Sequence, residues 1–167
     1  MATQDIFARL KQDHDRHREL LARIAEAVGG QARGDQGRLR DLFEEFTLEV
    51  KGHAAAEEQA LYSTMMRKPE TTDDTRHSVA EHHEIEEMLN DLAATDLSSD
   101  DWETGFRALR HDYLHHIEEE EEEHFPEFSR YLTEEDEAHM KQVFDRRKKA
   151  EKASAEVTPE KMEDAKE

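Results

Sequence analysis

The sequence predicts an all-α protein, in which an up-down-up-down four-helix bundle is followed by a short fifth C-terminal helix and a disordered tail. Glycine and proline, which interrupt helices, account for only 6 and 3 of the 167 residues. Apolar residues recur at steps of three and four, the spacing that places side chains on one face of an α-helix. The short connections between the periodic segments favour antiparallel neighbours in a bundle.

The ends of the four long helices follow from local signals. Gly29-Gly30 should end the first helix, and Pro69 should close the second. Pro126 should kink or end the fourth. With polar caps before the third and fourth helices, the expected helices cover about residues 3–28, 35–67, 72–94 and 100–126.

The C-terminal part begins with a fifth helix, whose cap is predicted at Thr133 because acidic residues follow it in the first turn. This helix should reach about Lys149. Residues 151–167 are charged, have little to bury and contain Pro159, so we expect them to be disordered. The chain is therefore divided into a domain over residues 1–150 and a tail over residues 151–167.

Composition narrows the class of function. The chain has no cysteine, so a bound metal would need nitrogen and oxygen ligands. The formal charge of 23 − 43 = −20 disfavours a nucleic-acid partner, since phosphate binding needs clustered cations. We expect no membrane span, because no segment approaches eighteen apolar residues, and the N-terminus does not read as a signal peptide. A cytoplasmic location is the simplest expectation.

The inward stripe of each predicted bundle helix is apolar except at one level, where it contains histidine or glutamate. An unpaired carboxylate is costly to bury, and buried charges are normally paired or bound to metals. Imidazoles and carboxylates that converge from four helices therefore predict a metal site in the core. Its candidate ligands are His14, His53, Glu57, His82, His116 and Glu120.

Spacing indicates how such a site could be built. His53 with Glu57, and His116 with Glu120, are i, i+4 pairs on one helix face. Each pair can supply an imidazole to one ion and a carboxylate that bridges two ions. His14 and His82 would each add a terminal imidazole. Two such pairs that face each other suggest two ions with shared carboxylate bridges.

The chain also contains an internal sequence repeat, which indicates that a helix hairpin is present twice and that a pseudo-twofold axis passes through the site. Asp13-His14 corresponds to Glu81-His82. The segment that begins at His53 corresponds to the one that begins at His116, so Tyr62-Ser63 lines up with Phe125-Pro126.

These motifs, over roughly residues 5–130, resemble the hemerythrin-like (HHE cation-binding) family, in particular its bacterial and actinobacterial members. Four elements carry the resemblance: Asp13-His14, His53-x-x-x-Glu57-Glu58, Glu81-His82, and His116-x-x-x-Glu120-Glu121 followed by Phe125-Pro126. The resemblance implies two Fe ions, bridged by the two glutamates and by an oxo or hydroxo group. It also implies small ligands: O2, NO or H2O2.

The sequence departs from the oxygen-carrying members of that family in two ways. Those members have a second histidine four residues before the position of His82, where this chain has Ser78. They also have an aspartate where this chain has Glu120. The missing histidine would leave an iron open to water, to substrate or to Tyr113, which could also be a packed core aromatic. We therefore expect small-molecule redox chemistry or sensing rather than O2 transport.

Several functions stay open at this point. A di-iron peroxidase or an NO-related oxidoreductase would turn over H2O2 or NO; alternatively, the protein senses or stores O2, iron or NO without turnover. A structural zinc site uses the same donor types. A ferritin-type site needs two E-x-x-H elements, and the bundle offers only Glu121 to His124, out of phase with the stripe. The sequence indicates no oligomeric state.

The other histidines and acids are given lesser roles. His17 should be packed beside the site or should support a ligand, and the register of the third helix favours His82 over His83. Glu58 and Glu121 could support the ligands, whereas the rest of the run from Glu118 to Glu123 should be solvated. The histidines expected at the surface or close to a loop are His77, His111, His115, His124 and His139.

Overall fold

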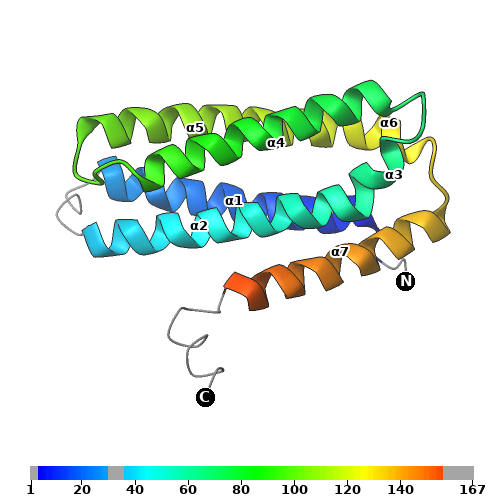
Figure 1. The fold of residues 1–167 in the computed structure, drawn as a ribbon, viewed down its shortest axis with the longest axis horizontal. Helices are drawn as coiled ribbons and strands as arrows, with labels where there is room; N and C mark the ends of the chain where they lie inside the picture. Colours follow the sequence, from blue (N-terminus) through cyan, green and yellow to red (C-terminus); the bar gives the residue numbers. More distant parts are fainter. Residues whose placement is uncertain (1–3, 30–35, 156–167) are drawn as a thin grey trace, which may run out of the picture.

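A computed structural model describes residues 4–29 and 36–155 of the chain. Its four long helices pack as the predicted antiparallel bundle (Figure 1). They are α1 (Ile6–Gly29), α2 (Gln36–Glu57), α4 (Thr72–Ala93) and α5 (Asp100–Glu119). The predicted fold class is therefore confirmed. Among the described residues, no helix is both long enough and apolar enough to cross a bilayer.

The predicted polar N-terminal caps are present at α5 and at the last helix. Ser99 lies in an extended conformation before α5, and its hydroxyl accepts a hydrogen bond from the Trp102 backbone N–H at 3.2 Å. At the start of the last helix, the Asp136 N–H donates to the Thr133 hydroxyl at 3.0 Å. The Thr133 N–H donates in return to the Asp136 carboxylate at 2.9 Å.

Two π-helical turns interrupt the second and fourth long helices, and neither turn was predicted from the sequence. The turn η2 (Glu58–Tyr62) directly follows α2 and leads into α3 (Ser63–Met65). The turn η3 (Glu120–His124) directly follows α5 and leads into α6 (Phe125–Ser129). The two turns occupy nearly equivalent positions in the two repeated hairpins, which supports the internal sequence repeat.

Pro126 does not end the fourth helix, which continues through α6 to Ser129. Of the two predicted outcomes, a kink or an end, the end is wrong, and the π turn explains why. A proline inside an α-helix removes one hydrogen-bond donor and crowds the carbonyl four residues earlier. Here it lies in the first turn of α6, immediately after a turn whose bonding pattern already departs from the α-helical one.

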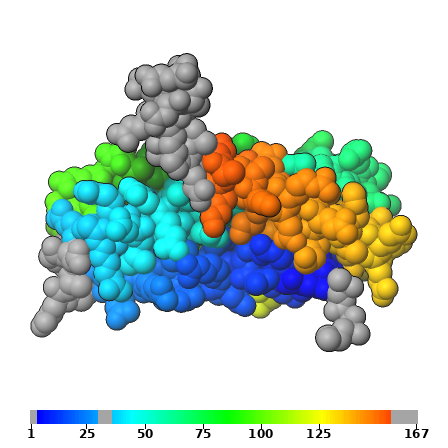
Figure 2. All heavy atoms as spheres, turned by 90° about the horizontal axis from the view of Figure 1, so that it is seen from below, coloured from blue at the N-terminus to red at the C-terminus, as the bar shows by residue number. Residues whose placement is uncertain are grey.

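The last helix, α7 (Glu134–Ala155), crosses the bundle and packs on α1, α2 and η2 (Figures 1 and 2). The predicted fifth helix is confirmed, but it ends later than Lys149. Glu151–Ala155, which the sequence analysis placed in the disordered tail, are helical. An i, i+4 ion pair between Arg147 and Glu151, at 2.7 Å, supports this extension. Residues 156–167 lie outside the described part of the chain.

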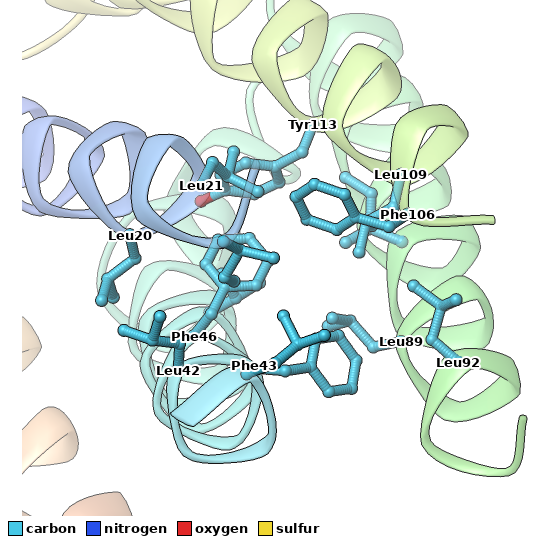
Figure 3. Packing of buried hydrophobic residues seen from close by; sticks show 14 of the residues in the cluster. Leu20, Leu21, Leu42, Phe43, Phe46, Leu89, Leu92, Phe106, Leu109 and Tyr113 are labelled. Carbon is cyan, nitrogen blue, oxygen red and sulfur yellow. The ribbon is translucent and has the colours of Figure 1, made fainter. Parts of the chain in front are cut away.

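The core consists of two apolar clusters at opposite ends of the bundle. The larger one joins α1, α2, α4 and α5 around Phe46, Phe106 and Leu89 (Figure 3). The second joins the start of α1 to η2, α6 and α7. On α1, for example, Leu10 belongs to the second cluster and Leu20 to the first. The polar level that contains His14 therefore lies between two apolar layers.

Candidate metal centre

All six predicted ligands lie buried at this polar level. Two sets of donor atoms each lie within 4.8 Å of one another. One set contains His14, His53 and Glu57, and the other contains Glu57, His82, His116 and Glu120. Because Glu57 belongs to both sets, they form one continuous centre. We call its two parts the α1/α2 half (His14, His53) and the α4/α5 half (His82, His116).

The two glutamates lie between the halves. Glu57 Oε2 is 3.9 Å from His53 Nε2, and Glu57 Oε1 is 3.1 Å from His82 Nε2. Glu120 Oε1 is 2.9 Å from His116 Nε2 and 3.8 Å from His14 Nε2. Each carboxylate thus contacts or approaches one imidazole from each half. This arrangement can place two cations side by side with a carboxylate on either side of the pair.

The far side of each candidate imidazole is held by a carboxylate. Ionised carboxylates only accept hydrogen bonds, so in neutral imidazoles Nδ1 carries the proton and the Nε2 lone pair faces the centre. The pairs are His53 Nδ1 to Asp13 (2.9 Å), His116 Nδ1 to Glu81 (3.1 Å), His14 Nδ1 to Glu121 (2.8 Å) and His82 Nδ1 to Glu58 (3.4 Å). The four contacts form two symmetry-related sets.

These contacts give Glu58 and Glu121 the supporting position that the sequence allowed. The same position of Asp13 and Glu81 was not predicted, although both precede a candidate histidine in the repeated motif. One helical step turns each away from its own neighbour and toward a histidine of the next helix. An acid directly before each single histidine was the signal that could have revealed them.

Several buried polar atoms at the centre have no hydrogen-bond partner among the residues that the structure describes. They are His14 Nε2, His53 Nε2 and both carboxylate oxygens of Glu57. Leaving a buried acceptor without a donor costs about 1–3 kcal/mol, and more for a charged group. A cation between these atoms would satisfy them together. Imidazole nitrogens with carboxylate oxygens, and no thiolate, suit iron, manganese or zinc, so the residues present fit the predicted metal.

Proton binding by the cation-free centre follows from burial and close charges. Burial and the Glu120 charge raise the pKa of Glu57. Burial opposes ionisation of Glu120 as well, but His116 and His14 lower its pKa. Burial also disfavours the charged form of His116, yet Glu120 and Glu81 raise its pKa to about 9. When cations bind, Glu57 would have to lose its proton, and the His116 imidazolium would have to lose one of its two ring protons.

The repeated motif is broken at one pair of positions, Tyr62 and Phe125. Each lies five residues after a central glutamate, and a π turn brings residues five apart onto one face. The Tyr62 hydroxyl donates to Glu120 Oε2 at 2.7 Å. Phe125, its counterpart, instead stacks on His14 with ring centroids 6.0 Å apart. One oxygen of Glu120 therefore accepts a hydrogen bond from a hydroxyl, whereas neither oxygen of Glu57 does so among the described residues.

Tyr113, named as a candidate for the open position, hydrogen-bonds to His17. Its hydroxyl lies 2.5 Å from His17 Nδ1, and its ring meets Phe46 edge-on. Both Tyr113 and His17 are buried. His17 thus has the packed position that the sequence favoured, and burial together with His53 and His14 lowers its pKa.

The remaining histidines follow the prediction with one exception. His83 is exposed while His82 is buried, and His77, His111, His115 and His139 are exposed. His124 is buried, so its expected surface position is wrong. It belongs to η3, whose wider turn rotates it inward. Its Nδ1 lies 3.0 Å from the hydroxyl of Ser78, the residue at the site of the missing family histidine.

A cavity of about 360 Å³ opens onto the centre between α2 and α4. His53, His82, His116 and Tyr113 line its inner part. Arg147 and Glu151 of α7 line it as well, together with small residues of α2, Ala54 and Ala55. A cavity of this size admits small ligands.

The helix α7 also supports the α1/α2 half directly. Lys148 Nζ lies 2.8 Å from Asp13 Oδ2, the oxygen that accepts from His53. Burial opposes ionisation of Asp13, but His53 and Lys148 keep its pKa well below its usual range. Phe144 packs edge-on against the His53 ring, with centroids 5.5 Å apart.

The helical bundle and its paired histidine–glutamate centre define an all-α cation-binding protein. Residues 5–128 match the family described as the hemerythrin HHE cation binding domain. The chain belongs to this family, and the match ends before α7. The comparison with curated proteins gave no match, and neither did the comparison with solved structures.

Removal of the Lys148 charge should weaken cation binding, because Lys148 holds the carboxylate behind His53. Loss of a group that hydrogen-bonds directly to a metal ligand typically lowers metal affinity about 10–100-fold. Lys148 contacts Asp13 rather than the candidate ligand His53 itself, so we expect Lys148→Gln to lower affinity by up to about 10-fold. Competition with a chelator measures this. Lys149→Gln, at an exposed neighbouring position of α7, is the control. Equal affinities in both variants would contradict the role of Lys148.

Loss of the Tyr62 hydroxyl should destabilise the cation-free protein, because Glu120 Oε2 would be left buried without a donor. For Tyr62→Phe we expect the free energy of unfolding to fall by about 1–3 kcal/mol. Urea denaturation measures this change. Tyr131→Phe, at a partly buried site, should change stability less. If both variants match the wild type, the hydrogen bond to Glu120 contributes no stability.

Proposed function

We propose that this protein is a non-haem di-iron protein that reacts with small ligands. His14 and His53 would hold one iron, His82 and His116 the other. Glu57 and Glu120 would lie between the two. The observation that carries the proposal is the position of Glu57, which is shared by both donor sets and has two buried, unpaired oxygens.

The donor set supports iron with room for a ligand. Each half offers two imidazoles and a share of two carboxylates, so the protein donors do not fill an octahedral shell at either ion. The cavity reaches residues of both halves, His53 as well as His82 and His116. When bound, iron would supply one-electron redox steps and open positions for O2, NO or H2O2.

The residues around the cavity would control protons and water. Tyr113 lines the cavity, and burial together with Glu120 and Glu57 raises its pKa, so it keeps its proton. When His17 Nδ1 carries a proton, the Tyr113 oxygen accepts the hydrogen bond from His17, and the Tyr113 O–H is free to donate a hydrogen bond to a ligand in the cavity. The apolar clusters above and below the centre limit solvent entry. These features favour peroxidase-like or NO-related redox chemistry.

Removal of Glu57 should abolish cation binding at the buried centre, because both halves lose their common carboxylate. Wild-type protein loaded anaerobically with ferrous iron, and then desalted to remove readily exchanged ions, should contain two irons per chain by elemental analysis. Glu57→Ala should lose most of this iron and should no longer gain thermal stability on loading. His139→Ala, at an exposed site of α7, should match the wild type. Equal iron in all three proteins would refute the assignment.

Tyr113→Phe should slow the reaction of the ferrous protein with H2O2 without loss of iron. Removal of one hydrogen-bond donor to a developing charge typically costs about 10²–10³-fold, so we expect at least a 10-fold slower step in stopped-flow absorption. His111→Ala, at an exposed site of α5, controls for nonspecific effects. An unchanged rate would remove Tyr113 from the chemistry. Binding of NO or O2 without consumption of any ligand would instead indicate a sensor or store.

A further inference from the structure

A second cluster of histidines and glutamates lies on the outer side of α4 and α5, beyond the α4/α5 half. Two of its imidazoles, His77 and His115, are exposed, and a third, His124, is buried. All three turn Nε2 toward Glu119. His77 and His124 lie 3.1 and 3.3 Å from Glu119 Oε1, and His115 lies 3.4 Å from Glu119 Oε2.

The outer cluster repeats the chelating unit of the buried centre. His77 with Glu81 on α4, and His115 with Glu119 on α5, are H-x-x-x-E pairs, as are His53 with Glu57 and His116 with Glu120. Residues at i and i+4 lie on one helix face, so the pairs of α4 and α5 can meet across the helix boundary. Donor atoms of His77, Glu81 and Glu119 lie within 4.8 Å of one another.

His124 gives the cluster a fixed inner wall. It is only 4% exposed, and its Nδ1 lies 3.0 Å from the Ser78 hydroxyl, which leaves Nε2 directed at Glu119. The hydroxyl oxygen can accept a hydrogen bond from Nδ1–H, and the Nε2 lone pair is then free for a cation. Donor atoms of Glu119, Glu123 and His124 form a second set within 4.8 Å. Both sets share Glu119.

Glu81 connects the outer cluster to the buried centre. Its Oε1 lies 3.4 Å from His77 Nε2 and 3.1 Å from His116 Nδ1. A cation at the cluster would therefore lie one carboxylate away from a histidine of the centre. The acidic run around Glu119 and the net charge of −20 would raise the local concentration of cations.

We propose that His77, Glu81 and Glu119 form an outer binding site for a divalent transition-metal ion. His115 and His124, which each approach Glu119, are further imidazoles that the ion can recruit. Imidazole nitrogens with carboxylate oxygens suit Zn²⁺, Fe²⁺ or Mn²⁺. The site is open to solvent through His77 and His115, so it exchanges its ion more readily than the buried centre. Because Glu81 also contacts His116, the outer site would hold its ion next to the buried centre. The outer site stands whether or not the buried ions are iron.

Zinc binding to the full-length chain tests the proposal. We expect the double variant His77→Ala/His115→Ala to bind one Zn²⁺ per chain fewer than the wild type by calorimetry and elemental analysis. Both residues are exposed, so circular dichroism should show an unchanged fold. The matched control is His111→Ala/His139→Ala, which removes two exposed histidines outside the cluster. Equal zinc in the wild type and the His77/His115 variant, or an equal loss in the control, would overturn the site.

Glu57→Ala separates the outer site from the buried one. In this background the buried centre should be empty, and one Zn²⁺ should remain that is lost on further substitution of His77 and His115. That result would support the outer site even if the di-iron proposal fails. If Glu57→Ala binds no zinc while the wild type does, the outer site is refuted and the buried centre holds all of the metal.

Discussion

The structure depends on the burial of Glu57 and Glu120 between four imidazoles. Burying carboxylates without a compensating charge is too costly for a marginally stable domain, so the surrounding residues must supply protons or a cation. The apolar clusters on either side fix the height and phase of the four helices. They hold the two glutamates where donors from all four helices converge. Helix packing therefore buries negative charge that a bound cation would compensate.

The two π turns adapt this scaffold to the centre. The turn η2 begins directly after Glu57 and η3 begins at Glu120, and each brings the residue five positions after the glutamate onto the glutamate's face. The same insertion in both hairpins preserves the pseudo-twofold relation, while Tyr62 and Phe125 break it chemically. A hydroxyl occupies one oxygen of Glu120 but neither oxygen of Glu57. The two bridging candidates are therefore unequal, although their helices are related by the repeat.

Sequence periodicity predicted the helices and the convergence of the six candidate residues, because His53 with Glu57 and His116 with Glu120 are spaced for regular helix. It failed where the regular helix stops. His124 was placed at the surface because a 3.6-residue period does not describe a π turn. The contact of Lys148 with Asp13 joins residues 135 positions apart, and no local pattern encodes it. The helical Glu151–Ala155 segment was missed because its charge resembles that of a disordered tail.

The surroundings of the centre differ on its two sides, and this difference bears on the outer site. Asp13 and Glu81 are counterparts, each accepting a hydrogen bond from a candidate histidine. Asp13 forms ion pairs with Arg9 of α1 and with Lys148 of α7, a helix beyond the family match. At Glu81 the corresponding partner is His77, exposed and beside Glu119. A divalent ion bound there would place positive charge beside Glu81, as Arg9 and Lys148 do beside Asp13, so occupancy of the outer site would reduce the electrostatic difference between the two halves.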